Sequence, residues 1–385
     1  MELLVPQNEK DEEIFLSIVI PALNEEISIE KFIDWCKAGI NKSKVNAEIL
    51  IIDSSNDNTA ELAFKKGARV LKTFKRGLGR AYIDSLKYIR GKYILMGDCD
   101  LTYDFRDLNE FVDAFKKGYD FVMGSRFKGF IEPNSMPLLH RYFGTPITTF
   151  ILNFIYRSNF SDIHCGMRGI SKKAFEKIAL KSQGWEYASE MIVKAIRMKL
   201  HSTEVPVKFY KDPPGRFSHH VRSGFWSPWY AGWINLKVMF VYTLDTFMFK
   251  PGIFLFFTGL IFFAKSLINA IFDQNYFFGL TTLSFFMILL GQQLFTSSII
   301  ARLQHNYRKG FELKILKHLT YDFGMGLSFI IFFSSFVLFC ISILCYFTST
   351  KSLFIYTCLI FGFTSVMSIL SALFVIFIEF IRLRR

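Results

Sequence analysis

The sequence predicts an α/β domain with a Rossmann-like, mostly parallel sheet, followed by a membrane domain of about four helices. Short β-branched apolar runs alternate with helical patterns up to about residue 225, which is typical of a sheet covered by helices on both faces. Beyond that point, long apolar runs with almost no charge dominate. The whole chain of 385 residues is 51% hydrophobic and contains 46 Phe, which is too apolar for an ordinary soluble enzyme of this length.

Four strand signals occur in the first hundred residues, each followed by a polar segment. They cover residues 16–21, 48–52, 68–71 and 93–96, and each is a short apolar run typical of a buried strand. Helices are expected between them. The first carries apolar residues at helical spacing from residue 29 to 36, the second is capped at residues 57–59 and runs through residue 63, and the third covers residues 81–89.

Four later stretches are long and apolar enough to cross a bilayer, since about 20 residues suffice. They cover residues 251–272, 276–301, 323–347 and 353–378. Residues 226–250 before them are rich in Trp and Tyr, which favours a juxtamembrane segment at the membrane interface. The chain is therefore divided into a globular domain (1–225), this interfacial segment (226–250) and a transmembrane domain (251–385).

Positive charge outside the spans predicts the orientation in the membrane. The connection between spans two and three and the C-terminal tail are rich in Lys and Arg, whereas the other two connections carry almost none. The N-terminus lacks the pattern of a secretory signal. With four crossings, these features predict an integral multi-pass protein whose globular domain and both termini are cytoplasmic. The basic residues concerned are Arg302, Arg308, Lys309, Lys314, Lys317, Arg382, Arg384 and Arg385.

A formal net charge of +13 favours anionic partners. No nucleic-acid-binding motif accompanies this charge, so lipid headgroups and phosphorylated substrates explain it better than nucleic acid does. The six Cys residues show no metal-ligand spacing, which is typical of free thiols in a reducing compartment.

The residues directly after the predicted strands are polar and acidic. Ligands of a parallel sheet collect beyond the carboxyl ends of its strands. Asp98 and Asp100 follow the strand at residues 93–96, where alternate carboxylates suit Mg²⁺ or Mn²⁺ that itself holds a diphosphate. The alternative interpretation is a solvated acidic turn. The run at 53–57 offers acceptors and hydroxyls for a base and ribose, or caps a helix.

A basic, glycine-rich run at residues 75–80 (KRGLGR) precedes a predicted helix. Glycine allows close backbone approach, and a helix N-terminus attracts anions, so this run is a candidate phosphate site. By itself the pattern is weakly specific.

Taken together, the motifs PALNEE, IIDSSNDNT, RGLGRA, GDCD, GSR, DIHCGMR, GWEYASE and EVPV resemble those of family 2 glycosyltransferases with the A-type fold. Their order and spacing match over residues 16–225. With four spans behind them, the chain resembles the polyprenyl-phosphate glycosyltransferases, close to the dolichyl-phosphate mannose and glucose synthases.

The resemblance implies roles for particular residues. A metal would be held by Asp98 and Asp100. The lipid phosphate would meet Arg126 and Arg141, while Asp162 lines the same cleft and is counted with the catalytic residues. The pattern departs from the family at residues 52–55, where two aspartates followed by Gly-Ser are usual and this chain has Ile52-Asp53-Ser54-Ser55, which loses one carboxylate, and at Thr102, where Gln is usual. The nucleotide and its diphosphate would be held by Pro21, Leu23, Asn24, Glu25, Asp53, Ser55, Gly77, Gly79, Asp98, Arg168 and Arg216.

The predicted reaction transfers a hexose from a UDP-glucose or GDP-mannose type of donor to polyprenyl or dolichyl phosphate. A phosphate monoester is already ionised near pH 7, so its oxygen can displace the diphosphate directly, with inversion and without a protein nucleophile. A homo-oligomer is plausible from the resemblance. Two alternatives stay open: a processive membrane polysaccharide synthase, although its Gln-x-x-Arg-Trp signature is missing from the sequence, and a transporter or flippase with an inactive transferase-like domain.

Overall fold

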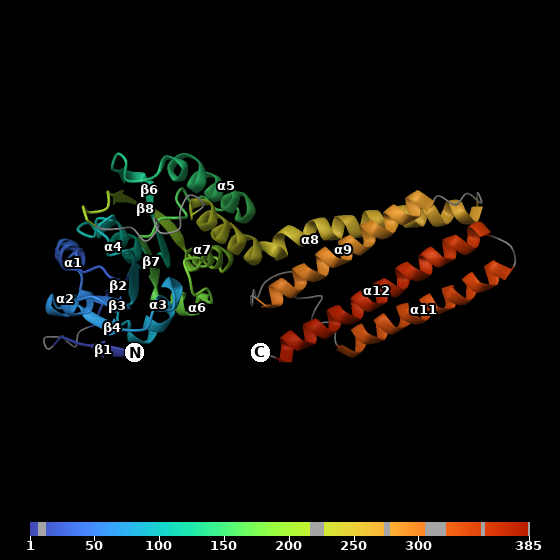
Figure 1. Ribbon diagram of the computed structural model, residues 1–385, viewed down its shortest axis with the longest axis horizontal. Helices are drawn as coiled ribbons and strands as arrows, with labels where there is room; N and C mark the ends of the chain where they lie inside the picture. Colours follow the sequence, from blue (N-terminus) through green and yellow to red (C-terminus); the bar gives the residue numbers. More distant parts are fainter. Residues whose placement is uncertain (7–12, 216–226, 273–277, 305–320, 348–350, 384–385) are drawn as a thin grey trace. The chain divides into compact units, whose positions relative to one another are not determined.

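The computed structural model describes residues 1–6, 13–215, 227–272, 278–304, 321–347 and 351–383 (Figure 1). The chain forms two compact units, Met1–Val241 and Tyr242–Arg385. Helix α8 (Ser227–Phe272) contains the boundary between them. The predicted boundary at residue 225 lies outside the described residues, and the one at residue 250 falls within α8, so both stay predictions.

The N-terminal unit is built on one mixed sheet of eight strands in the order β1-β4-β3-β2-β5-β7-β6-β8. The central pairs β4-β3, β3-β2 and β2-β5 are parallel, as is β6-β8, whereas β7 runs antiparallel to both of its neighbours and β1 lies antiparallel to β4. The strands are β1 (Glu2–Leu4), β2 (Leu16–Ala22), β3 (Ala47–Asp53), β4 (Arg69–Lys72), β5 (Tyr93–Met96), β6 (Phe121–Ile131), β7 (Arg168–Ser171) and β8 (Ser202–Phe209).

Helices cover this sheet, and the predicted alternation of strand and helix over the first hundred residues is confirmed. Consecutive residues of β2, such as Ile18, Val19 and Ile20, are all fully buried because helices lie on both faces of the sheet. The helices are α1 (Ile29–Ser43), α2 (Thr59–Lys65), α3 (Leu78–Ser85) with the 3₁₀ turn η1 (Leu86–Tyr88), α4 (Asn109–Lys116), the π-helical turn η2 (His140–Gly144), α5 (Thr145–Tyr156), α6 (Lys172–Ile178) and α7 (Tyr187–Arg197).

The register of the strands brings several predicted site residues to one edge of the sheet. Asp53 lies opposite Ala22 at the ends of β3 and β2. Further along the sheet, Met96, Arg168 and Met123 lie side by side on β5, β7 and β6. Because β6 runs in the same direction as β5, the residues that follow both strands leave the sheet at the same edge as Asp53.

The C-terminal unit consists of long apolar helices: the remainder of α8, then α9 (Phe278–Gln304), α11 (Tyr321–Phe347) and α12 (Lys351–Leu383). Among the described residues, three helices are long and apolar enough to cross a membrane: Phe247–Asn269, Phe278–Ala301 and Ile360–Ile378. Within this described part of the chain, the prediction of four spans is corrected to three. The apolar stretch found in α11, Tyr321–Ser334, is shorter than the about 20 residues that a crossing needs.

This correction removes one support for the predicted orientation. Placing both termini on one side of the membrane required an even number of crossings. The basic connection after α9 lies largely outside the described residues, so its position does not test the prediction either. The predicted interfacial segment 226–250 is helical from residue 227 onward, and it continues into the first span without a break in α8.

Candidate active site

The loop after β5 carries the two predicted metal-binding carboxylates. Asp100 is held in place by Thr102, whose backbone N–H and hydroxyl both donate to Oδ1 of Asp100, at 3.0 and 2.6 Å. Leu101 between them has a φ of 64°, a left-handed conformation that costs a non-glycine residue about 1 kcal/mol. Such strain is typical of functional turns. Thr102, the departure from the family pattern, therefore orients Asp100.

Asp98 lies against Gly166 and a set of buried tyrosines. Its Oδ2 is 2.6 Å from the place that a Cβ on Gly166 would occupy, so any larger residue there would require the Asp98 carboxylate to move. Burial raises the pKa of the Tyr82 and Tyr187 hydroxyls, and the negative charge of Asp98 raises both further. These hydroxyls are therefore neutral at physiological pH, and the Tyr82 hydroxyl donates to the carbonyl of Gly97 at 3.3 Å.

The residues of this loop fit a hard divalent cation. Within the described residues, no group of three or more His, Cys, Asp or Glu side chains gathers into a metal cage. Mg²⁺ is usually held by one or two carboxylates together with waters and substrate phosphates, so Asp98 and Asp100 with a diphosphate suit it. Both aspartates are partly exposed, which leaves them open to a ligand.

Gly166 offers a direct test of this loop. Replacing Gly166 by Ala is expected to push the Asp98 carboxylate aside, because the new methyl group would lie 2.6 Å from Oδ2. We expect transfer activity to fall about 10- to 100-fold, as for other losses of metal-ligand orientation. Initial rates at varied Mn²⁺ concentration measure the effect. Gly144→Ala is the matched control, since its nearest contact at 3.6 Å is ordinary. Equal rates for the two variants would contradict the assignment.

At the same edge of the sheet, Asp53 at the end of β3 carries a buried oxygen that no described residue pairs with. The residue is 4% exposed. Its Oδ1 has no hydrogen-bond partner among the residues that the structure describes, whereas Oδ2 accepts the N–H of Ser55 at 3.4 Å. Burial raises the pKa of Asp53. An unsatisfied buried acceptor is costly, so this oxygen is suited to accept a hydrogen bond from a ligand.

Two loops lock together around Asp53. Asn24, with a φ of 55°, donates its N–H to the Ser55 hydroxyl at 2.8 Å and accepts the N–H of Asn56 at 3.0 Å. The cap interpretation of Asp57 is supported, because its Oδ1 accepts the N–H of Thr59 at the start of α2. Asn24 and Ser55 thus shape the loops.

The other predicted nucleotide-binding residues nearby have different surroundings. Pro21 pairs with Ile52 in the sheet, Leu23 is half-buried, and the buried Glu25 accepts the Ser28 hydroxyl.

The glycine-rich run before α3 packs against another loop. A Cβ on Gly77 would lie 2.3 Å from the carbonyl of Gln183, and one on Gly79 would lie 2.3 Å from that of Ser182. The N–H groups of Gly79 and Arg80 already donate to the carbonyls of Gly184 and Gln183. These contacts explain the glycines as close backbone packing. Phosphate binding by these amides would require the hydrogen bonds to open.

Within β6, past its pairing with β7, Arg126 forms a buried, two-pronged ion pair with Asp162. Arg126 Nε and Nη2 donate to the two carboxylate oxygens at 2.7 and 2.8 Å, and the Arg126 backbone N–H donates to Oδ2 at 3.1 Å. Asp162 is fully buried and Arg126 is 8% exposed. Burial alone would raise the pKa of Asp162, but the Arg126 charge and its hydrogen bonds lower it below the usual value. The two predicted residues therefore act as one unit.

Glu204 supports this pair from β8. It accepts the backbone N–H groups of Ser161 and Asp162 at 2.6 and 3.2 Å, and Lys128 at 2.7 Å. The sequence motif EVPV drew attention to this strand without giving Glu204 a role. Glu190, from the motif GWEYASE, supports a different loop, because it accepts the N–H groups of Lys181 and Ser182 and so holds the segment that packs on Gly77.

Two histidines and a threonine surround the same pair. Nε2 of His164 lies 2.8 Å from the Thr148 hydroxyl on α5. Burial and the Arg126 charge lower the pKa of His164 to about 4, and they lower that of His140 as well. Arg141 is half-exposed beside His140 in η2, with its guanidinium over the Tyr142 ring.

The other predicted site residues differ in their surroundings. Arg168 is 1% exposed, and its guanidinium donates to the carbonyls of Ala188 and Cys165, which indicates a structural role in the described structure. Arg216 lies outside the described residues.

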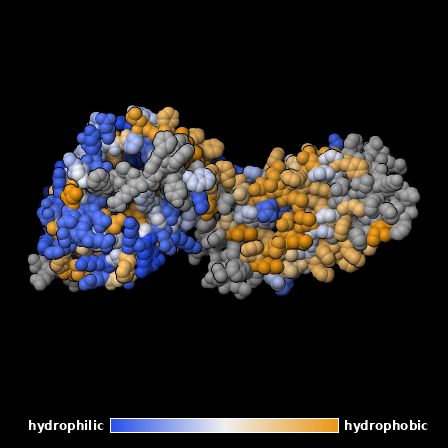
Figure 2. All heavy atoms as spheres, viewed as in Figure 1, coloured by the Kyte–Doolittle hydropathy of each residue, from blue (hydrophilic) through white to orange (hydrophobic). Residues whose placement is uncertain are grey.

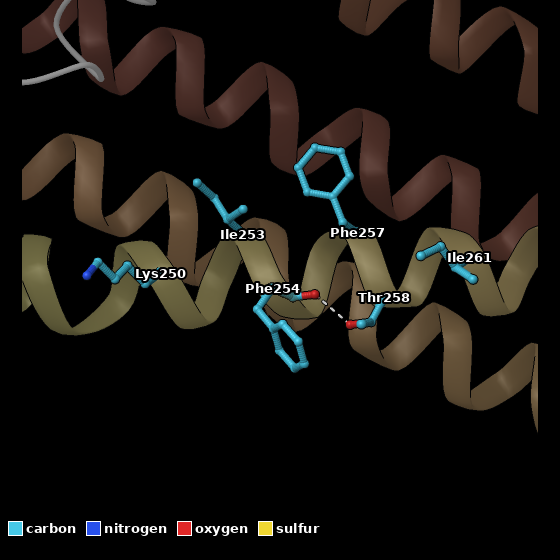
Figure 3. A pocket seen from close by; sticks show the side chains of 6 residues that line it. All are labelled: Lys250, Ile253, Phe254, Phe257, Thr258 and Ile261. Carbon is cyan, nitrogen blue, oxygen red and sulfur yellow. Dashed lines mark hydrogen bonds between the residues drawn. The ribbon is translucent and has the colours of Figure 1, made fainter.

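A separate apolar hollow of about 440 Å³ lies on α8 in the C-terminal unit (Figure 3). All of its lining residues lie on one helix, from Lys250 to Ile261, and Thr258 donates there to the carbonyl of Phe254. All of these residues belong to the candidate span Phe247–Asn269, so the hollow is not part of the site at the sheet edge.

Comparison with known proteins identifies the family of the N-terminal unit. The family described as glycosyl transferase family 2 matches residues 17–179. An uncharacterized protein of Methanocaldococcus jannaschii is 32% identical over 220 residues, which cover 54% of this chain and 88% of that protein. The chain belongs to glycosyl transferase family 2, and its N-terminal unit is a glycosyltransferase domain.

The relatives include named hexosyltransferases. The low-salt glycan biosynthesis hexosyltransferase Agl6 of Haloferax volcanii is 42% identical over 196 residues, or 51% of this chain and 48% of that protein. The dolichyl-phosphate beta-glucosyltransferase of Saccharomyces cerevisiae is 28% identical over 237 residues, or 53% of this chain and 70% of that protein. The chain thus spans about half the length of the Haloferax relative.

Among solved structures, mannosyl-3-phosphoglycerate synthase from Rubrobacter xylanophilus is similar, with a TM-score of 0.46 and 17% identity. The match covers 59% of this chain and 73% of that one.

Proposed function

We propose that this protein transfers a hexose from a nucleotide-diphosphate sugar to a polyprenyl phosphate, giving a lipid-linked sugar phosphate. The observation that carries the proposal is the convergence at one sheet edge of a buried unpaired acceptor, Asp53, two carboxylates, Asp98 and Asp100, and the buried Arg126–Asp162 pair. Relatives named as a hexosyltransferase and as a dolichyl-phosphate beta-glucosyltransferase support the reaction class.

The donor would bind across the ends of β2, β3 and β5. Asp53 offers a carboxylate oxygen to an N–H or O–H group of the base or ribose. Asp98 and Asp100 would hold Mg²⁺ or Mn²⁺, and such a cation neutralises a diphosphate as it departs. Thr102 and Gly166 keep these two carboxylates in position. A UDP-glucose or GDP-mannose type of donor fits this set equally well.

The acceptor phosphate would approach from the side of Arg126. Two hydrogen bonds to Asp162 hold the Arg126 guanidinium in place, so we expect it to keep the same position before and after the substrate binds. A planar, pre-oriented arginine suits phosphate recognition, and the half-exposed Arg141 adds a second cation. The phosphate oxygen is already ionised near pH 7, so holding it in line with the anomeric carbon suffices for a single displacement with inversion.

The three candidate spans support a lipid acceptor, because a polyprenyl chain stays in the bilayer and the domain must reach its headgroup. We propose that the N-terminal unit lies on the cytoplasmic side, in keeping with the Lys- and Arg-rich sequence after the second span. A homo-oligomer remains part of the proposal.

A panel of labelled nucleotide sugars tests the proposal. Membranes containing the full chain are incubated with each donor and a polyprenyl phosphate, and the lipid fraction is extracted. We expect one hexose donor to give a product with a single sugar, which depends on divalent metal and is stereochemically inverted. A long glycan would support the polysaccharide synthase instead. Transfer that is equally fast in excess chelator would overturn the metal-dependent mechanism.

A further inference from the structure

The helical segment formed by η2 and α5 exposes large apolar side chains on the surface of the N-terminal unit. Phe143, Ile147, Phe150 and Phe154 repeat at intervals of four, three and four residues and therefore form one stripe. They are 60%, 53%, 69% and 75% exposed, and Tyr142 beside them is 61% exposed. We call these five residues the α5 apolar face. Hydrophobic side chains also gather over α5 in the space-filling view (Figure 2).

The opposite side of the same helix is largely polar and faces the protein. Thr145 and Thr149 are 5% exposed, and the Thr148 hydroxyl meets His164 at 2.8 Å. An amphipathic helix on a soluble domain shows the reverse arrangement, with its apolar stripe toward the core. A contiguous exposed apolar stripe of this kind marks an interaction surface.

The charge around this face identifies the kind of partner. From residue 133 to residue 161 the sequence contains no Asp or Glu, whereas it contains Arg141 and Arg157. A helix with an aromatic-rich apolar face and only basic charges beside it is suited to the surface of an anionic bilayer. Tyr142 has the amphipathic ring that is enriched at membrane interfaces. The same chain contains candidate membrane spans, so we expect the protein to be associated with a bilayer.

We propose that the α5 apolar face lies in the headgroup region of an anionic bilayer and holds the Arg126–Asp162 pair at the depth of lipid headgroups. The link to the site is the inward side of the helix, where Thr148 contacts His164. His164 in turn donates its backbone N–H to Asp162 at 3.3 Å. The part of this inference that concerns the acceptor rests on the proposed function, whereas membrane docking by itself does not.

Docking is measured first, without reference to catalysis. A spin label is attached at Phe150→Cys in the full chain, with the C-terminal unit's cysteines (Cys340, Cys345 and Cys358) replaced by Ser, in nanodiscs containing anionic lipid. We expect the label to be accessible to oxygen and protected from a water-soluble nickel chelate. A label at Lys116→Cys on the exposed end of α4 is the control and should show the reverse.

Two outcomes of this measurement would overturn docking. One is a Phe150 label that is as accessible to the nickel chelate as the Lys116 label. The other is dipolar broadening between labels on two copies, which would show that a second copy of the chain covers the face.

Transfer rates then test the consequence for the site. The double variant Phe150→Asp/Phe154→Asp is expected to lose about 10-fold or more in transfer to a long-chain polyprenyl phosphate in bilayers. Transfer to a short-chain, water-soluble phosphate acceptor should be unchanged, and Phe150→Leu/Phe154→Leu should behave like the parent chain.

Equal losses with both acceptors would show a structural role, and no loss with either would show that the face does not dock; both results overturn the proposal. If the parent chain transfers to neither acceptor, the proposed function fails, while the spin-label measurement still decides docking.

Discussion

Replacing Asp100 by Asn is expected to lower the transfer rate by about 10²–10³-fold, the range seen when one preorganised electrostatic group is removed from an active site. An Asn side chain still accepts from Thr102 through Oδ1, so the loop geometry is preserved while the negative charge is lost. The loss should therefore appear in the rate and in Mn²⁺ binding, and not in thermal stability. Initial rates, Mn²⁺ titration followed by electron paramagnetic resonance and a thermal melt measure the three quantities.

A suitable control lies on the same segment. Asp107 is on the surface, 38% exposed in its side chain, and pairs with Lys42. Asp107→Asn removes the same charge without touching the turn, and surface pairs contribute little to stability, so both rate and Mn²⁺ binding should stay near the parent values. An active Asp100→Asn protein with unchanged Mn²⁺ affinity would contradict the assignment of this loop as the metal-binding site.

The largest effect on stability is expected at the Arg126–Asp162 pair. Asp162→Ala leaves Arg126 buried without its partner, and breaking a buried pair from one side costs about 3–5 kcal/mol of unfolding free energy. Removing both charges in Arg126→Met/Asp162→Leu should recover most of that loss, because the uncompensated charge disappears. Thermal or denaturant unfolding of the purified full chain measures the difference between the two variants.

Activity separates the two roles of this pair. If Arg126 binds the acceptor phosphate, the double variant should be stable yet inactive, and its loss should persist with a water-soluble phosphate acceptor. Glu204→Gln is a milder companion, since the amide oxygen still accepts from the Ser161 and Asp162 backbone while the partner of Lys128 is neutralised. A stable double variant with full transfer activity would show that the pair is purely structural.

Much of the candidate site follows from local sequence. The strand ends at Asp53 and Asp98 could be predicted because each follows a short, continuous apolar run that the structure confirms as β3 and β5. The acidic pair after β5 predicts a cation site from residue type alone, since alternate carboxylates suit a hard cation. By contrast, the apolar face of α5 was missed, because the helix points its polar residues inward and pattern reasoning assigns an apolar stripe to the core.

Other residues needed the tertiary structure because their partners are distant in sequence. Arg126 and Asp162 are 36 residues apart, and Glu204 reaches Ser161 across 43. The glycines at 77 and 79 show the same limit: the run predicts phosphate binding, yet the closest atoms belong to the backbone of residues 182–184.

By itself, the sequence determined the alternation of strands and helices, the acidic strand ends, the family and the membrane character of the second half. Those features depend on residue types and short spacings along the chain, which local sterics and apolar periodicity control. Only the tertiary structure decided the antiparallel β7, the pairing of Arg126 with Asp162 and the role of Gly166. Each of these depends on which distant segments pack together, because side-chain burial and close contact are properties of the assembled fold.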